Sequence, residues 1–444
     1  MNESDRKTSA RDFTKVPLEL PTWPLSTERS IAAVAGVLSS GRWAISGTKG
    51  EAPNWEQKFC DAFAGYIGTD YAVATCNGTA ALTIALEALG IGVGDEVIVP
   101  GLTWVACASA VLTVGAIPVL VDVDETFCLS PTAAANAITE KTRAILLVHA
   151  YCQIADLHVF QTICEERNLH LVEDCSQAHG AEWNGRKVGS FGSVSCFSLQ
   201  QVKLLTCGEG GIALTSDRIL YDRMQELRAD GRRYNENARP GEMDLKEFGS
   251  IQGRNYCLSE IQSALAFAQL QDLDQQNARR RVNADTLDRL LGAIAGVSTP
   301  KASPNITSRV FYQYLVRVDP AVYNYDPDWL AREFSQQLGV YCELIDRPLN
   351  SNALYVPHKT RRFADSGRGR ERIDPQQYGL PISNLLQKSH IAISHWLLLA
   401  EPDQMDSVAV VVSKIISDLP LVRDAVASVR QSAESNISAS RKGF

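Results

Sequence analysis

Residues 169–216 read LHLVEDCSQAHGAEWNGRKVGSFGSVSCFSLQQVKLLTCGEGGIALTS. Two apolar runs in this stretch, Leu169–Val172 and Val194–Phe197, are short, branched and bounded by turn residues, which favours two buried strands. The first run leads directly into Asp174, and the second leads into a polar loop that carries Lys203. The stretch therefore predicts an acid and a lysine at the same edge of one sheet.

An acid at one strand end and a single lysine just past another strand are what a pyridoxal 5'-phosphate (PLP) site requires. The lysine binds the cofactor aldehyde covalently, and the acid pairs with the protonated pyridine nitrogen so that the ring can accept electrons. Lys203 is accordingly the predicted catalytic residue, and Asp174 is its predicted partner across the cofactor.

The same residues belong to longer motifs. Residues 173–181 read EDCSQAHGA, and residues 197–211 read FSLQQVKLLTCGEGG. These motifs resemble the EDxxQAHGA turn and the FSxxxxKxLxxGEGG lysine loop of the DegT/DnrJ/EryC1/StrS family of sugar aminotransferases. The resemblance implies an α/β protein of PLP-dependent transferase fold type I, similar to aspartate aminotransferase. Its large domain would hold a mostly parallel seven-stranded sheet, followed by a smaller α+β C-terminal domain.

The composition excludes several other classes of protein. The chain has 444 residues, is 45% hydrophobic, and carries a net charge of −8, which argues against a nucleic-acid partner. Its 11 cysteines are odd in number and form no CxxC pair, so we expect reduced thiols, a cytoplasmic location and no metal site. The first residues have no signal-peptide core, and no apolar run is long enough to span a membrane.

A second part of the predicted site lies near residue 77. Residues 71–76 favour a strand, Asn77-Gly78-Thr79 a turn, and residues 80–89 a helix. A glycine turn that opens a helix leaves free N–H groups at the positive end of the helix dipole, which suits a phosphate. The pattern is common on its own, but Gly78 and Thr79 match the phosphate-binding position of the family.

The resemblance assigns four more residues to the cofactor. Trp104 matches an aromatic that stacks on the pyridine ring, Gln177 a residue beside the phenolic oxygen, and Ser198 a phosphate-binding serine. Asn255 matches an asparagine that reaches the phosphate of the neighbouring subunit, so the protein is expected to be a homodimer with shared active sites.

The order of the strands gives an argument that is independent of the family. Strand and helix patterns alternate, which predicts a parallel sheet covered on both faces. Ligands in such folds bind beyond the carboxyl ends of the strands. Asn77, Trp104, His149, Asp174 and Ser198 all fall at or just after such ends. For His149 and the nearby Tyr151, substrate contact and ordinary local hydrogen bonding both remain open.

The domain layout follows from changes in pattern along the chain. We predict an N-terminal arm (residues 1–25), a large PLP-binding domain (26–275), a small C-terminal domain (276–424) and a tail (425–444). One long helix is expected from residue 259 to beyond 290, and a loop is expected from about 232 to 249. The helix that carries Trp104 is expected to open at Gly101.

The resemblance implies an aminotransferase that cycles between PLP and pyridoxamine 5'-phosphate. Residues 348–362 are similar to an element of the branch that aminates keto-cyclitols such as scyllo-inosose in aminoglycoside-type biosynthesis. That branch implies L-glutamine as the amino donor, with glutamate as the alternative. Three other functions are alternatives: a nucleotide-linked ketosugar aminotransferase, a dehydrase of the same family, which would carry histidine in place of Lys203, and a non-catalytic PLP-binding regulator.

Overall fold

A seven-stranded sheet forms the centre of the larger part of the molecule. The computed structural model describes residues 18–50, 52–364 and 373–422. The strand order is β1 (Tyr71–Thr75), β9 (Gly211–Thr215), β8 (Val194–Ser198), β5 (His170–Asp174), β4 (Thr142–Val148), β2 (Glu96–Pro100) and β3 (Ile117–Val121). Only β9 runs antiparallel to its neighbours within this sheet. The predicted mostly parallel seven-stranded sheet is therefore confirmed.

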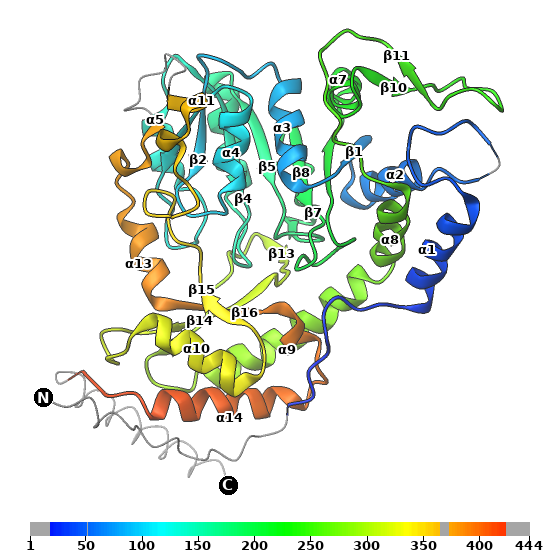
Figure 1. Cartoon of the computed structure of the whole chain (residues 1–444). Helices are drawn as coiled ribbons and strands as arrows, with labels where there is room; N and C mark the ends of the chain where they lie inside the picture. The colour runs from blue at the N-terminus through cyan, green and yellow to red at the C-terminus, as the bar shows by residue number, and fades with distance from the viewer. Residues whose placement is uncertain (1–17, 51, 365–372, 423–444) are drawn as a thin grey trace, which may run out of the picture.

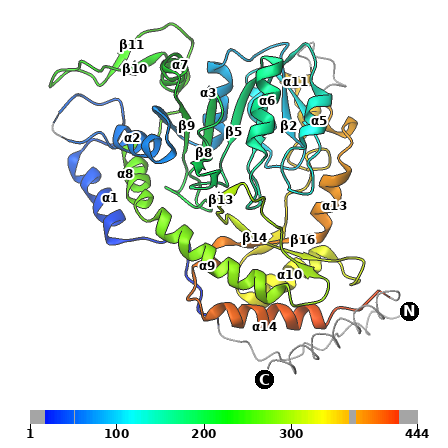
Figure 2. The ribbon, with the colours of Figure 1, turned by 180° about the vertical axis from the view of Figure 1, so that it is seen from behind.

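Helices cover both faces of this sheet because its strands are apolar on both sides. Leu146 and Val148 pack in one hydrophobic cluster with α3 (Gly78–Ala88), α4 (Ala106–Thr113) and α7 (Arg218–Arg228). Ile145 and Leu147 point to the other face. They pack with α2 (Trp55–Ile67), α5 (Pro131–Ala137), α6 (Leu157–Arg167) and α8 (Glu260–Leu270). Figures 1 and 2 show these two layers from the front and from behind.

A smaller α+β unit lies below the large sheet in Figure 1. Its antiparallel sheet has the order β12 (Val297–Ser298), β14 (Gln313–Val318), β16 (His390–Ser394) and β15 (Cys342–Leu344). Three helices cover this sheet: α9 (Leu273–Leu291), α10 (Pro327–Leu338) and α14 (Gln404–Ser417). The prediction that the smaller unit is of the α+β class is confirmed.

The expected long helix is two helices. Helix α8 ends at Leu270 and α9 begins at Leu273, with Gln271 and Asp272 between them. Helix α9 alone then runs from the large sheet to the small one (Figure 1). The predicted domain boundary at residue 275 falls in the first turn of α9. Ile345 and Tyr355, which lie within the predicted small domain, pack into a core cluster of the large sheet. The domain limits therefore stay a prediction.

The segment expected to be a loop contains a β-ribbon. Strands β10 (Arg232–Tyr234) and β11 (Leu245–Glu247) pair antiparallel. The ion pair between Arg42 and Asp244, whose nitrogen and oxygen are 2.7 Å apart and nearly buried, ties the ribbon to the segment after α1 (Glu28–Ser40). Sequence periodicity cannot find strands of three residues, because alternation needs a longer run.

The remaining elements are short, except for α13, and most of them lie on the surface. They are β6 (Glu182–Trp183), β7 (Arg186–Lys187), β13 (Ile306–Ser308), α11 (Arg361–Ala364), α13 (Pro381–Ser389) and three 3₁₀ turns, η1 (Pro357–Lys359), η2 (Pro375–Gln377) and η3 (His395–Leu399). Within the described ranges, no helix combines the length and the apolarity needed to cross a bilayer. Residues 1–17 and 423–444 lie outside the described residues, so most of the predicted arm (1–25) and all of the predicted tail (425–444) do too.

Candidate active site

A cavity of about 390 Å³ lies beyond the carboxyl ends of β5 and β8, beside the first turn of α3. It is lined by all of the predicted site residues except Asn255, namely Gly78, Thr79, Trp104, Asp174, Gln177, Ser198 and Lys203. Residues separated by more than a hundred positions along the chain thus meet in one place, as the strand-end argument predicts.

Asp174 is the last residue of β5, and its carboxylate is held from two sides. Its Oδ2 accepts a hydrogen bond from the Cys107 thiol (Sγ to oxygen, 3.1 Å), and its Oδ1 accepts one from the Ser176 N–H (3.0 Å). Burial, together with the charge of Asp174, raises the pKa of the Cys107 thiol well above its ordinary value. The thiol therefore stays protonated and acts as a donor, which fixes the carboxylate at the cavity wall.

Glu173, the preceding residue, points into the protein instead of the cavity. One carboxylate oxygen, Oε2, accepts from the Gly189 N–H (2.9 Å) and meets His149 Nε2 at 3.2 Å, and the other, Oε1, accepts from the N–H groups of Phe191 and Gly192. Burial alone would raise the pKa of Glu173. The hydrogen bond from His149 and those from the N–H groups of Gly192 and Gly189 outweigh that effect and lower the pKa.

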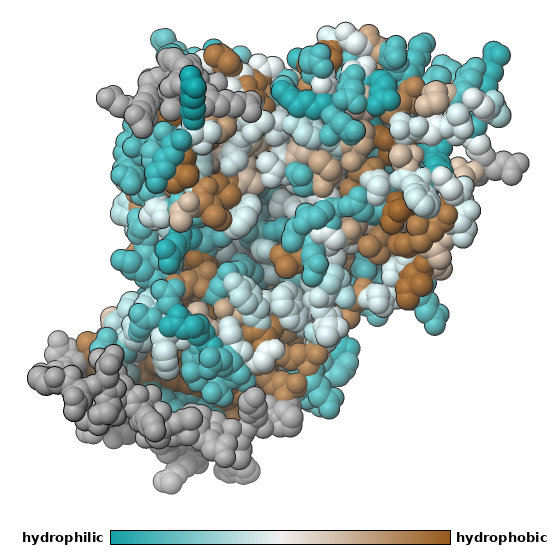
Figure 3. Space-filling view, viewed as in Figure 1, coloured by the Kyte–Doolittle hydropathy of each residue, from teal (hydrophilic) through white to brown (hydrophobic). Residues whose placement is uncertain are grey.

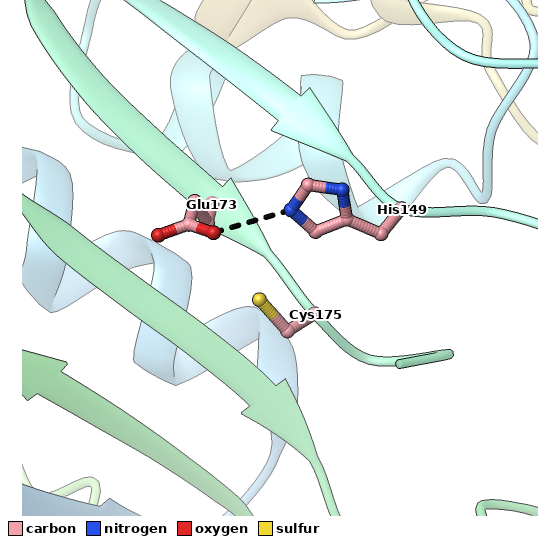
Figure 4. A group of neighbouring side chains, drawn as sticks. All are labelled: His149, Glu173 and Cys175. Atoms are coloured by element: carbon pink, nitrogen blue, oxygen red, sulfur yellow. Dashed lines mark hydrogen bonds and ion pairs between the residues drawn. The ribbon is translucent and has the colours of Figure 1, made fainter. Parts of the chain in front are cut away.

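His149 is explained by local hydrogen bonding. Its ring is buried, its Nδ1 accepts from the Ala155 N–H at 3.2 Å, and its Nε2 faces Glu173, as Figure 4 shows. His149, Glu173 and Cys175 bring three potential metal ligands within 4.8 Å of one another. Both His149 nitrogens and both Glu173 oxygens are already used by protein groups, so this cluster is a structural brace for the strand end that carries Asp174.

Replacing Glu173 with glutamine is expected to destabilise the fold by about 2–4 kcal/mol at neutral pH, because an amide NH₂ would face buried donors. The folded pKa of Glu173 is lowered, so its stabilisation is present above the unfolded value of about 4.3 and disappears as the pH falls through the folded pKa. The difference in urea midpoint between Glu173→Gln and the unmodified protein should therefore stay nearly constant from pH 7 to about 5 and shrink as the pH is lowered below about 4.3.

Glu182→Gln is the matched control for this prediction. The Glu182 carboxylate is partly exposed and pairs with Lys187 at 3.0 Å, so the change should cost less than about 1 kcal/mol. An effect of Glu173→Gln that is equally small, or that does not change with pH, would contradict the bracing role.

The Gln177 side chain has a defined orientation. Its Oε1 accepts a hydrogen bond from the Tyr151 N–H at 3.0 Å, so its amide nitrogen is left to donate into the cavity. Tyr151 adopts a positive φ of 53° and also donates its hydroxyl to Asp346 Oδ2 at 2.7 Å. Tyr151 is buried and supports Gln177, and it does not line the cavity itself.

The first turn of α3 fits an anionic group. The Asn77 side chain caps the helix by accepting from the Ala80 N–H at 2.8 Å, which leaves the N–H groups of Gly78 and Thr79 without partners inside the helix. A Cβ on Gly78 would lie 2.9 Å from the Cβ of Ser198, so only glycine lets the helix start approach the end of β8 this closely. These residues could hold a phosphate.

The sequence predicted that Trp104 lies inside a helix that opens at Gly101. In the structure Trp104 lies before that helix. Helix α4 begins at Ala106, and Trp104 occupies the preceding turn at the cavity wall. Its side chain is 53% exposed, which leaves one face of the indole free to stack on a flat ring.

Lys203 completes the cavity from the loop between β8 and β9. Its Nζ lies 4.1 Å from the centre of the Tyr312 ring. With a lysine, an opposing carboxylate and a phosphate cradle around one space, the residues present fit PLP.

The model of the DegT/DnrJ/EryC1/StrS aminotransferase family matches residues 24–393. The chain belongs to this family. It is 45% identical over 404 residues to the L-glutamine:scyllo-inosose aminotransferase of Streptomyces griseus, an alignment that covers 90% of this chain and 95% of that protein. It is 44% identical over 399 residues to the L-glutamine:2-deoxy-scyllo-inosose aminotransferase of Streptoalloteichus tenebrarius, with 89% and 94% coverage.

Among solved structures, 3-amino-5-hydroxybenzoic acid synthase superposes with a TM-score of 0.76 at 28% identity, and the match covers 90% of this chain and 99% of that one. The expected fold type is confirmed. This member of the DegT/DnrJ/EryC1/StrS family is a PLP-dependent aminotransferase.

In this DegT/DnrJ/EryC1/StrS aminotransferase, Asn255 lies away from the cavity. It is exposed, and its Oδ1 accepts only a long hydrogen bond, 3.4 Å, from the Cys257 N–H. This position leaves the side chain available to a second subunit. Contact of Asn255 with the neighbouring subunit stays a prediction.

Sequence reasoning missed Tyr312, Cys107 and Glu209. Tyr312 and Glu209 line the cavity, and Cys107 lies directly behind Asp174. Cys107 lies in the first turn of α4, directly after the turn that carries Trp104, and this closeness to a predicted site residue is the signal that could have found it. Tyr312 carries no local signal, because it reaches the cavity only through the packing of the small sheet against the large one.

Proposed function

We propose that this aminotransferase transfers the amino group of L-glutamine to a keto-cyclitol of the scyllo-inosose type, in aminoglycoside-type biosynthesis. The observation that carries the proposal is the 45% identity, over almost the whole of both chains, to an enzyme named for those two substrates. The second relative, named for the 2-deoxy ketone, supports the same class of acceptor.

The charges at the cavity support a neutral acceptor. Among the cavity-lining residues in the described ranges, Lys203 is the only cation, whereas Asp174 and Glu209 are acids. A nucleotide-linked ketosugar carries a diphosphate, which binds well only where several cationic or N–H donors are free to meet it. A polyhydroxylated ring needs hydrogen-bond partners and no such charge.

We propose the following roles for the chain's own residues. When bound, PLP supplies an aldehyde for amine exchange and a ring that accepts the electron pair of the donor Cα–H bond. Lys203 would hold the cofactor, and its freed Nζ would carry the proton from the donor Cα to the cofactor carbon that receives the amino group. The Asp174 carboxylate, fixed by Cys107 and Ser176, keeps the positive charge at the ring nitrogen.

The other residues orient the cofactor. The first turn of α3, with Gly78 and Thr79, and the Ser198 hydroxyl bind the phosphate. The Gln177 amide would donate to the phenolic oxygen, and Trp104 would stack on the ring and exclude water from that face.

The acceptor is tested by titrating the pyridoxamine form of the enzyme with scyllo-inosose, 2-deoxy-scyllo-inosose and a nucleotide-linked ketosugar. Return of the PLP absorbance with the cyclitols alone is the expected result. Return with only the nucleotide-linked ketosugar would replace this proposal with its alternative. The amino donor is tested by adding L-glutamine or L-glutamate to the PLP form and measuring the loss of the PLP absorbance.

We also propose a homodimer in the cytoplasm. Figure 3 shows apolar side chains gathered over α1 and the following loop, where Ile31, Leu38 and Trp43 are 63%, 49% and 54% exposed. Apolar side chains gathered in this way are typical of an interface. All 11 cysteines are free thiols, which supports a reducing compartment.

Asn255→Ala is expected to raise the dissociation constant of PLP about tenfold, because one hydrogen bond to the phosphate from the neighbouring subunit would be lost. Equilibrium binding of PLP to the cofactor-free protein measures this. Asn237→Ala, on the exposed ribbon loop, is the control and should leave the constant unchanged.

Mixed dimers test whether Asn255 acts on the active site of the neighbouring subunit. A dimer of one Asn255→Ala subunit and one Lys203→Ala subunit contains one site in which Lys203 and the partner's Asn255 are both intact. At limiting PLP, mixing the two proteins should therefore restore activity. If mixing restores nothing, Asn255 does not act across subunits.

A further inference from the structure

The loop that carries Lys203 has no regular secondary structure, yet the backbone carbonyls on the side before the lysine are all hydrogen-bonded. Each of the five carbonyl groups from Ser198 to Val202 accepts a hydrogen bond. The donors, in order, are His179 Nε2 (2.9 Å), the Cys207 N–H (3.1 Å), the Lys203 N–H (2.8 Å), Trp23 Nε1 (2.8 Å) and His395 Nε2 (3.1 Å).

The two carbonyls next to Lys203 are bound by residues from distant parts of the chain. Trp23 belongs to the N-terminal segment, which runs beside α9 in Figures 1 and 2. His395 begins η3, directly after strand β16 of the small sheet. Trp23 is 178 positions from its acceptor and His395 is 193 positions from its own. The direction of the Lys203 side chain therefore depends on groups outside the large sheet.

The buried environment keeps His395 neutral. Burial, followed by the charge of the nearby Arg280, holds the pKa of His395 well below its ordinary value. A neutral imidazole has one N–H, and the Val202 carbonyl can only accept, so the proton is on Nε2. The ring packs edge-on against Trp23, with the ring centres 4.6 Å apart.

Arg280 restricts the position of Trp23, the residue that binds the Gln201 carbonyl. Its guanidinium is fully buried, lies 5.3 Å from the centre of the Trp23 ring, and donates to the side-chain oxygens of Asn277 and Gln276. A buried cation over an indole face restricts the ring and favours the orientation in which Nε1 meets the Gln201 carbonyl.

We propose that Trp23 and His395 are positioning residues for Lys203: by binding the carbonyls of Gln201 and Val202 they fix the backbone from which the lysine side chain enters the cavity. The inference rests on the proposed role of Lys203. Misplacement of a reacting group by about 1 Å can cost up to about a hundredfold in rate. Loss of only one of the two hydrogen-bond donors, Trp23 or His395, should lower the rate by less than this.

The test uses the full-length holoenzyme with Trp23→Phe, which keeps an aromatic ring and removes the N–H, and with His395→Leu, which removes the donor. His395→Gln keeps a side-chain N–H and serves as the rescue variant. Trp329→Phe is the matched control, because Trp329 lies on α10 and its side chain is 42% exposed.

Three quantities are measured for each variant. The first is the rate at which hydroxylamine releases the cofactor from Lys203 in the resting enzyme, which needs no substrate. The second is the single-turnover rate of the donor half-reaction, with its dependence on donor concentration. The third is the Tm of the cofactor-free protein, which reports stability alone.

We expect Trp23→Phe and His395→Leu to change the hydroxylamine rate and to slow the half-reaction by about three- to tenfold, with half-saturation by the donor within about twofold. His395→Gln should recover most of the rate, and Trp329→Phe should match the unmodified enzyme. If Trp23→Phe and His395→Leu lower only the Tm, or if both leave the two rates unchanged, the two residues are merely structural and the inference fails. A different result, PLP that is still bound covalently to Lys203→Ala, would refute the proposed function instead.

Discussion

Lys203→Ala is expected to lower turnover by about 10⁴-fold or more, because the change removes both the covalent anchor of the cofactor and the base that moves the substrate proton. Amino transfer from L-glutamine to scyllo-inosose measures the loss. Borohydride treatment followed by peptide mass analysis should find cofactor on the peptide that contains residue 203 in the unmodified enzyme and none in the variant.

The fold should survive this change. Lys203 lies in a cavity-facing loop, and its Nζ contacts the face of Tyr312. Lys141→Ala, an exposed lysine before β4, is the matched control and should be fully active. Covalently trapped cofactor in the Lys203→Ala protein would show that another amine carries it, and the assignment of the site would fail.

Asp174→Asn is expected to lower kcat by about 10²–10³-fold while PLP remains bound to Lys203. Asparagine keeps the shape of the side chain and can still accept from the Ser176 N–H. It loses the negative charge that stabilises a protonated ring nitrogen, and without that charge the ring is a weaker electron acceptor. Single-turnover kinetics of the donor half-reaction, with the cofactor absorbance as signal, measure this directly.

Asp156→Asn is the control for a change of aspartate to asparagine. Asp156 caps α6 outside the cavity, and asparagine is an equally good cap, so activity and Tm should not change. An Asp174→Asn enzyme that keeps more than about a tenth of the kcat would mean that the carboxylate does not act at the ring nitrogen.

Local patterns were enough for most of the fold. The strands around Glu173 and Ser198 are short apolar runs that end in turn residues, and their order predicted the parallel sheet. The helix that begins at Gly78 was visible from the Asn77 cap. The predictions failed where three-residue strands form, at β10 and β11, and where α8 and α9 break at Gln271 and Asp272. The break between α8 and α9 has no glycine or proline to mark it, and β10 and β11, although Pro240-Gly241 lies between them, are too short to show a periodic run.

The sequence by itself determined the family, the lysine and acid pair, and the phosphate turn, because each depends on residue types at fixed short spacings. Only the tertiary structure decided that Glu173 braces the strand while its neighbour Asp174 faces the cavity, and that His149 belongs to the brace. It alone placed Tyr312, Trp23 and His395 around the lysine loop. The physical reason is separation along the chain: the contacts of Glu173 and Asp174 cross 24 and 67 positions, and those of Trp23 and His395 cross 178 and 193. No local spacing records which backbone carbonyl a distant ring will bind.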